Sequence, residues 1–195
     1  RSDLIQNFEK LENISSGSNG RVYKVAKKNI YVLKEMKVEI SHEKFQPFLK
    51  EYELLSHFQH PNIIKVYKIF WSDKTRPASI LFEYCSMNLE EAIKKKIHSN
   101  VEIVIMIFEI IEGMRYVHSQ KVIHRDIKPS NILIGKDGKI KISDFGISKI
   151  MNAEEQSMTC GVGTQKYMAP EIIDENETYD EKVDVYSFGV VLYFI

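Results

Sequence analysis

One eight-residue segment, His124–Asn131, gathers side chains of the types that phosphoryl transfer requires. The Asp126 carboxylate could accept a proton from a hydroxyl group, Lys128 supplies a cation and Asn131 supplies an amide oxygen. Because Pro129 excludes a regular helix, these three groups could converge on one hydroxyl, one phosphate and one metal ion. The alternative is a polar loop in which they cluster by chance.

A second candidate, Asp144-Phe145-Gly146, directly follows the apolar run Ile140–Ile142. An acid at the end of a strand, with a glycine two residues later, suits a Mg²⁺ ligand on a mobile joint. Turns of this composition are common, so Asp144 becomes a candidate metal ligand only together with the preceding loop.

Lys34 and Glu51 are candidates because each charge is expected among apolar neighbours. Alternation along a strand places Lys34 on the same face as Ile30, Val32 and Met36. Helical spacing places Glu51 within the apolar stripe of His42–Phe58. Buried charges need partners, so we expect Lys34 to contact Glu51 or a phosphate. A lysine that extends to solvent and an exposed Glu51 are the alternatives.

The small-residue turn Ser15–Gly20 lies between two predicted strands. Gly17 and Gly20 would let backbone N–H groups approach phosphate oxygens. An ordinary hairpin turn would have the same composition.

These groups need elements to position them, and the chain divides into a β-rich part and a helical part. Residues 8–84 contain five predicted strands and one predicted helix, His42–Phe58. Residues 85–195 follow a hinge near Glu83–Ser86 and are mainly helical. The predicted strands of the first part are Phe8–Ile14, Arg21–Ala26, Ile30–Lys37, Ile63–Trp71 and Ala78–Tyr84. The predicted elements of the second part are helices Leu89–Lys96, Val101–His118 and Asp184–Ile195, with strands Asn131–Ile134 and Lys139–Ile142.

Composition limits the classes of function. The 195 residues have a formal net charge of zero, so bulk attraction to nucleic acid is not indicated. No signal peptide and no run long enough to cross a bilayer is recognised. The two cysteines, Cys85 and Cys160, favour a reducing compartment over a disulfide scaffold, and we expect a cytoplasmic protein.

Taken in order, these motifs resemble the eukaryotic protein kinase family over nearly the whole chain. The resemblance implies an α+β, two-lobed fold and an ATP- and Mg²⁺-dependent enzyme that phosphorylates protein serine or threonine. The matching segments are Tyr31–Lys34, Glu51, His60-Pro61-Asn62, His124–Asn131, Asp144-Phe145-Gly146, Ala169-Pro170-Glu171 and Asp184–Gly189.

The resemblance also implies roles for individual residues. Asp126 would be the catalytic base, Lys128 would neutralise the γ-phosphate, and Asn131 and Asp144 would hold Mg²⁺. Lys34, braced by Glu51, would bind the α- and β-phosphates. Further ATP-binding positions would be Ile14, Ser15, Gly17, Gly20, Val22, Val32, Leu133 and the backbone of Glu83 and Cys85. Phe82 would close the back of the adenine pocket, and Leu55, Val66, His124 and Phe145 would form an apolar column.

Lys128 and Thr164 resemble the serine/threonine class. Ser15 replaces the usual first loop glycine, Val32 replaces the usual alanine, and Cys160 lies near the usual site of an activating phosphothreonine. Arg125 is expected to pair with phosphate on Thr159 or, less favoured, Ser157.

The predicted helix Asp184–Ile195 is apolar on every side, so we expect further sequence to cover it. Residues 1–195 would then be part of a kinase domain. Two alternatives remain open. One is a kinase-like scaffold that binds without turnover, against which Lys34, Asp126, Asn131 and Asp144 are all present. The other is a small-molecule kinase, against which Thr164 and Ala169-Pro170-Glu171 resemble a peptide-docking segment.

Overall fold

The computed structural model describes residues 8–17, 20–27, 29–36, 42–71, 77–96, 98–151, 163–173 and 179–195. The chain forms two compact units. The first comprises Arg1–Phe58 and Ile64–Tyr84, and the second comprises Gln59–Ile63 and Cys85–Ile195.

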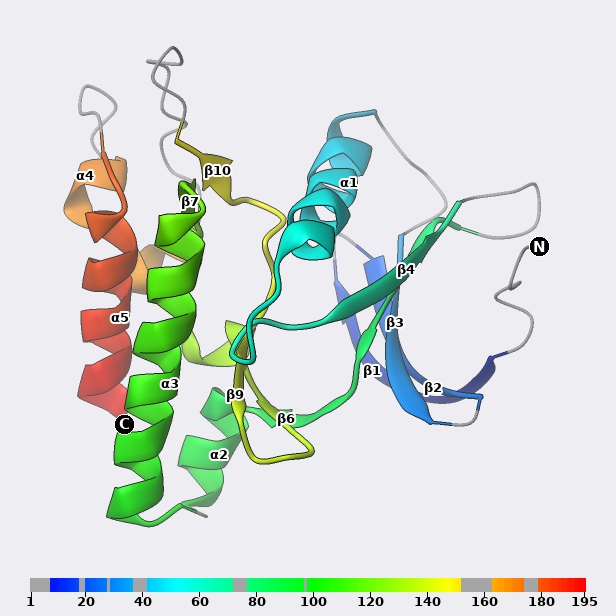
Figure 1. The fold of residues 1–195 in the computed structure, drawn as a ribbon. Coiled ribbons are helices and arrows are strands. Elements are labelled where there is room, and N and C mark those ends of the chain that lie inside the picture. The colour runs from blue at the N-terminus through cyan, green and yellow to red at the C-terminus, as the bar shows by residue number, and fades with distance from the viewer. Residues whose placement is uncertain are drawn as a thin grey trace. The chain divides into compact units, whose positions relative to one another are not determined.

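The first unit is a five-stranded antiparallel sheet with the order β1-β2-β3-β5-β4. Strands β1, β2, β3 and β4 are labelled in Figure 1. The register pairs Val22 of β2 with Lys34 of β3, and Lys34 in turn with Ile80 of β5. Lys34 is therefore in a central strand with a partner on each side. The strands are β1 (Glu9–Gly17), β2 (Gly20–Ala26), β3 (Ile30–Glu35), β4 (Val66–Phe70) and β5 (Ser79–Glu83).

Helix α1 (His42–His57) packs against β4 in this unit. Phe48 and Leu55 are buried on the stripe that also carries Glu51. The sequence predicted this helix with one further residue, Phe58. Elsewhere on the sheet, Val25, Leu33 and Leu81 form a separate small core under Tyr23, Tyr31 and Phe70.

The second unit combines helices with two small sheets. β6 (Cys85–Asn88), β8 (Ile132–Gly135) and β9 (Ile140–Ile142) form one sheet, and β7 (Val122–Ile123) pairs with β10 (Lys149–Ile150) in the other. Both α2 (Leu89–Lys95) and α3 (Asn100–Ser119) begin at side-chain caps. Ser99 and Glu102 form a reciprocal capping box that starts α3.

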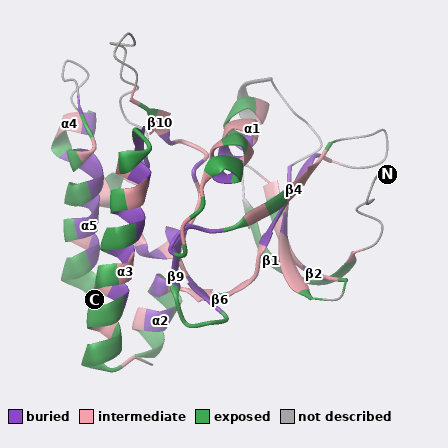
Figure 2. Ribbon diagram, in the orientation of Figure 1, coloured by how far each residue is buried: buried purple, intermediate pink, exposed green. Residues whose placement is uncertain are grey.

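Helices α3 and α5 (Lys182–Phe194) lie side by side, joined by the 2.8 Å contact between His118 and Asp184 (Figure 1). One face of α5 is buried and carries Val183, Phe188 and Val191. Figure 2 shows exposed positions on the other face, where Val185 and Tyr193 are 55 % and 85 % exposed. Helix α5 therefore carries apolar side chains on both its buried and its exposed face.

The predicted α+β class, a β-rich part followed by a helical part, is confirmed. Three short strands were missed, because two-residue β7 and β10 and four-residue β6 are too short for periodicity to reveal. None of the helices in the described ranges combines the length and the apolar character that a bilayer crossing needs.

Candidate active site

A buried carboxylate fixes the backbone that leads to Asp126. Asp184 is 1 % exposed, and its two oxygens accept hydrogen bonds from the backbone N–H groups of His124 and Arg125, each at 2.8 Å. The Nε2 atom of His118 lies 2.8 Å from the same carboxylate. Arg125 has a φ of 69°, a conformation that costs energy for a residue with a side chain. The Asp184 bonds hold that conformation in place.

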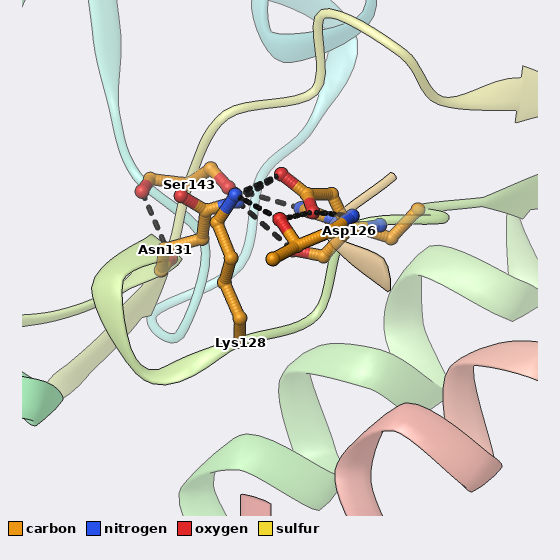
Figure 3. A network of polar contacts seen from close by, with 6 residues as sticks. Asp126, Lys128, Asn131 and Ser143 are labelled. Atoms are coloured by element: carbon orange, nitrogen blue, oxygen red, sulfur yellow. Dashed lines mark hydrogen bonds and ion pairs between the residues drawn. The ribbon is translucent and has the colours of Figure 1, made fainter. Parts of the chain in front are cut away.

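Both oxygens of Asp126 have partners from the same loop or from Thr164 (Figure 3). Lys128 Nζ donates to Asp126 Oδ2 at 2.6 Å and to the Thr164 hydroxyl at 2.6 Å. Thr164 donates to Asp126 Oδ1 through its hydroxyl at 2.8 Å and its backbone N–H at 3.1 Å. Thr164 is 36 positions from Lys128 and 38 positions from Asp126 in the sequence, so these contacts join two distant parts of the chain. The arrangement places an acceptor and a cation side by side.

Asn131 is oriented by the same carboxylate. A short 3₁₀ turn, η2 (Pro129–Asn131), turns its side chain back toward Asp126. Its Nδ2 donates to the Asp126 carbonyl at 2.9 Å and to Asp126 Oδ2 at 2.8 Å (Figure 3). Since Nδ2 makes these bonds, the amide oxygen of Asn131 is the atom that can serve as a metal ligand.

Asp144 follows the end of β9 and has a φ of 66°. The preceding residue, Ser143, donates to the carbonyl of Asn131 through both its backbone N–H and its hydroxyl, each at 2.9 Å. The following residue, Phe145, is fully buried, and its ring centroid lies 4.6 Å from that of His124. Asp144 is therefore a polar residue on a strained joint between two anchored neighbours.

Asn131 and Asp144 together form an oxygen-only donor pair, which is the chemistry that Mg²⁺ prefers. Their backbones are linked through Ser143, so the two side chains arise from adjacent positions. The residues present fit a magnesium ion.

The segment after Thr164 is held by α5. Ser187 Oγ donates to the carbonyl of Tyr167 at 2.7 Å, and Tyr167 belongs to the turn η3 (Gln165–Tyr167). Burial, with a smaller contribution from the Glu90 carboxylate, raises the pKa of Tyr167. Thr164 is thus followed by a braced segment whose side chains Gln165 and Lys166 are exposed.

In the first unit, Lys34 and Glu51 form the predicted pair. Lys34 Nζ lies 2.6 Å from Glu51 Oε2, and the side chains are 23 % and 3 % exposed. The Lys34 side chain therefore remains partly exposed, whereas the carboxylate of Glu51 is buried. The exposed alternatives for Lys34 and Glu51 are excluded by this contact.

In the small-residue turn Ser15–Gly20, backbone packing explains why position 20 is a glycine. Gly17 and Gly20 are paired at the end of the β1–β2 hairpin, while residues 18 and 19 lie outside the described residues. Gly20 has a φ of 152°, and a Cβ added there would lie 2.1 Å from the carbonyl oxygen of Glu35. Gly20 is required by backbone packing. Its contribution to phosphate binding stays a prediction.

The remaining predicted ATP-binding positions are distributed over both units. In the first, Ser15 pairs with Val22 and Lys24 pairs with Val32, whereas Ile14 is 49 % exposed. Predicted positions in the second unit lie in one sheet, where Cys85 pairs with Gly135, and Leu133 pairs with Asn88 and Lys141. The adenine pocket formed from these positions stays a prediction.

The hinge position Glu83 is already engaged in its own unit. Its backbone N–H donates to the carbonyl of Lys65 at 2.9 Å, and its side chain accepts from the Lys65 N–H at 2.7 Å. Phe82, predicted to close the adenine pocket, is 6 % exposed. The contact of the Glu83 backbone with adenine stays a prediction.

The sequence interpretation missed several positioning residues. Ser143 and His118 were not considered, and Asp184 was noted only as part of a motif. The signal for Asp184 was available, since an acid in an otherwise apolar helix must be paired. Tyr179 was also missed, although its hydroxyl lies 3.0 Å from Arg125 Nη1. Ser157, Thr159 and Cys160 lie outside the described residues.

Comparison with known proteins gives matches over most of the chain. Residues 8–195 match the family described as "Protein kinase domain". A probable cell division protein kinase of Encephalitozoon cuniculi is 34 % identical over 203 residues, covering 98 % of this chain and 62 % of the relative. A probable serine/threonine-protein kinase MRK1 homolog of the same organism is 34 % identical over 191 residues, covering 95 % of this chain and 58 % of the relative.

A plant relative, cyclin-dependent kinase G-1 of Oryza sativa subsp. indica, is 31 % identical over 194 residues. That match covers 96 % of this chain and 28 % of the relative. The chain thus spans about three fifths of the length of the two Encephalitozoon relatives and a smaller share of the rice protein.

Proposed function

The chain belongs to the protein kinase family, and from that premise we propose that the protein transfers the γ-phosphoryl group of ATP to a serine or threonine hydroxyl of another protein. The observation that carries the proposal is the contact set of Asp126. One carboxylate oxygen accepts from Lys128 at 2.6 Å, and the other accepts from the Thr164 hydroxyl at 2.8 Å. The serine/threonine class rests on Lys128 and Thr164, and on a relative named as a probable serine/threonine-protein kinase.

Asp126 orients the substrate hydroxyl and accepts its proton. Lys128 is already within hydrogen-bond distance of Asp126, so it can offset negative charge on the γ-phosphate at the same place. The rate gain comes from positioning and charge stabilisation, because the protein forms no covalent bond to the phosphoryl group in this scheme.

Lys34 binds the α- and β-phosphates of ATP, with Glu51 fixing the direction of its ammonium group. The amide oxygen of Asn131 and the carboxylate of Asp144 would hold Mg²⁺. When bound, Mg²⁺ supplies positive charge that neutralises phosphate oxygens. By the family resemblance, the adenine ring would be bound by Ile14, Val22, Val32 and Leu133 and by the backbone of Glu83 and Cys85.

The partner that follows from this activity is a protein with an accessible serine or threonine. A cytoplasmic location and the absence of nucleic-acid binding remain part of the proposal, on the composition of the chain. Gln165 and Lys166 are exposed beside Thr164, and we propose that they contact such a partner.

The test is phosphate transfer from γ-labelled ATP to a degenerate peptide library by the full-length protein, followed by identification of the labelled residue. Label on serine or threonine, dependent on Mg²⁺, supports the proposal. Label on tyrosine, or on a small molecule but not on peptide, contradicts it. Nucleotide binding without any transfer would favour the scaffold alternative.

A further inference from the structure

We propose that the Ser143 side chain is a positioning residue for the metal site, and that its hydroxyl sets the affinity for the metal–nucleotide complex. The inference rests on the proposed function, since it assigns Asn131 and Asp144 to a divalent cation. Ser143 itself contacts neither metal nor nucleotide in this account. It acts through the backbone of the two ligands.

Ser143 donates two hydrogen bonds to a single acceptor, the carbonyl oxygen of Asn131. Its backbone N–H and its Oγ each lie 2.9 Å from the carbonyl oxygen of Asn131 (Figure 3). A carbonyl oxygen has two lone pairs, so the Asn131 carbonyl is filled by this one residue. The backbone of one proposed metal ligand is thereby clamped to the residue that precedes the other.

The carbonyl of Ser143 is anchored as well. His124 Nε2 lies 2.9 Å from it, and since a carbonyl only accepts, Nε2 carries the proton. The other ring nitrogen, Nδ1, then accepts from the backbone N–H of Asp126 at 3.2 Å. Ser143 is therefore tied through N–H, C=O and hydroxyl to the loop that carries Asp126 and Asn131.

This anchoring matters because the next residue is strained. Asp144 has a φ of 66°, which an aspartate adopts at a cost and keeps only where its surroundings impose it. Loss of the Ser143 hydroxyl leaves the bonds of its N–H and C=O groups but removes one of the three constraints. Asp144 then samples other directions, and metal binding must restore the right one. Loss of the hydroxyl is therefore expected to weaken the binding of the metal–nucleotide complex.

The experiment compares Ser143→Ala with Ser143→Thr, which keeps the hydroxyl, in the full-length protein. Affinity for a fluorescent, non-hydrolysable ATP analogue is titrated with Mg²⁺ and again with a chelator. We expect Ser143→Ala to weaken binding about three- to tenfold with Mg²⁺ only, the range that one intramolecular hydrogen bond is worth. Ser143→Thr should restore the Mg²⁺-dependent affinity.

Ser187→Ala is the matched control. Ser187 is a buried serine of the same unit whose hydroxyl also donates to backbone carbonyls, those of Tyr167 and Val183. Its Mg²⁺-dependent affinity should equal that of the wild type. A loss of similar size in Ser187→Ala, or a loss in Ser143→Ala that persists in chelator, would show a general structural effect and overturn the proposal.

The outcomes also separate the two proposals. If Ser143→Ala shows the Mg²⁺-specific loss but the wild type transfers no phosphate to peptide, the proposed function fails and the Ser143 inference stands. If the wild type transfers phosphate and Ser143→Ala keeps full Mg²⁺ dependence, the Ser143 inference fails alone. Nucleotide affinity that is identical with and without Mg²⁺ in the wild type overturns both.

Discussion

The Lys34 ammonium group lies 2.6 Å from the Glu51 carboxylate, across 17 residues of chain, and the two side chains differ sharply in exposure. Glu51 is buried at 3 %, whereas Lys34 keeps 23 % of its side chain exposed. A buried carboxylate is stable only with its counter-ion, so Glu51 depends on Lys34 more than Lys34 depends on Glu51. Lys34 is therefore the more accessible member of the pair, and we expect its charge to contact a phosphate while Glu51 stays bound.

This asymmetry predicts unequal effects of single substitutions. Lys34→Met removes the counter-ion 2.6 Å from a buried carboxylate and should destabilise the protein by up to about 3–5 kcal/mol. Glu51→Gln should cost less stability but should weaken ATP binding, because the ammonium group loses its fixed direction. Denaturant unfolding and nucleotide titration on both variants provide the measurement.

The double variant Lys34→Met/Glu51→Gln is the control. It should recover part of the stability that Lys34→Met loses, with a coupling free energy of about 0.5–3 kcal/mol. Strict additivity of the two single effects would mean that the ion pair does not link them.

We predict that His60 makes the free energy of unfolding decrease in acid. Its ring stacks on Tyr116 with centroids 4.8 Å apart, and its Nδ1 accepts from the backbone N–H of Asn62 at 3.1 Å. Desolvation lowers the pKa of His60 below its usual 6.5, with Arg115 and Lys141 acting in the same direction and Glu112 opposing them. Protonation would also abolish the acceptor at Nδ1.

The sign of the effect follows from linkage. As the pH falls below 6.5, the unfolded chain binds a proton at His60 before the folded chain does, so the free energy of unfolding decreases. The decrease should be less than about 1 kcal/mol per pH unit, because the ring is only partly buried. His60→Gln should flatten the curve between pH 7 and pH 5. An unchanged slope in that variant would contradict the assignment.

Much of the site could be predicted from residue order alone. Asp126, Lys128 and Asn131 lie within six positions on a loop that Pro129 keeps out of a helix, so their convergence needs no long-range information. The Lys34–Glu51 contact followed from two periodicities, which placed each charge on an apolar face. The helix α1 was predicted to within one residue.

Other features depend on contacts that no local pattern reveals. The bond from Ser143 to Asn131 spans 12 residues, and Asp184 reaches His124 across 60. A serine before an aspartate is unremarkable by type, and its importance arises only when β8 and β9 pair. The left-handed backbone of Arg125 depends likewise on a tertiary hydrogen bond, from its N–H to Asp184, and that of Asp144 follows a residue held by tertiary hydrogen bonds.

Arg125 leads to a prediction about regulation. Its Nε donates to the carbonyl of Ile147 at 2.6 Å and its Nη1 to the hydroxyl of Tyr179 at 3.0 Å, so the guanidinium is fixed at a 9 % exposed site. A phosphate on Thr159 or Ser157 is expected to pair with it. Thr159→Ala with Ser157→Ala should therefore lower activity to the level of the dephosphorylated wild type.

Mass spectrometry of the active protein, before and after phosphatase treatment, measures this directly. Arg125→Lys should remove most of the difference in activity between the two forms, because lysine cannot reproduce a planar set of donors. Full activity in the double alanine variant, with no phosphate found at either position, would contradict the prediction.

The most direct test of the account is Asp126→Asn, with nucleotide affinity and peptide phosphorylation measured on the same preparation. Asparagine keeps the size of the side chain and one acceptor oxygen for Lys128 or Thr164, but it cannot take the proton of the substrate hydroxyl. We predict nearly unchanged affinity for Mg²⁺–ATP and a loss of turnover of about 10²- to 10⁴-fold. Turnover equal to that of the wild type would contradict the assignment of Asp126 as the base, and with it the proposed mechanism.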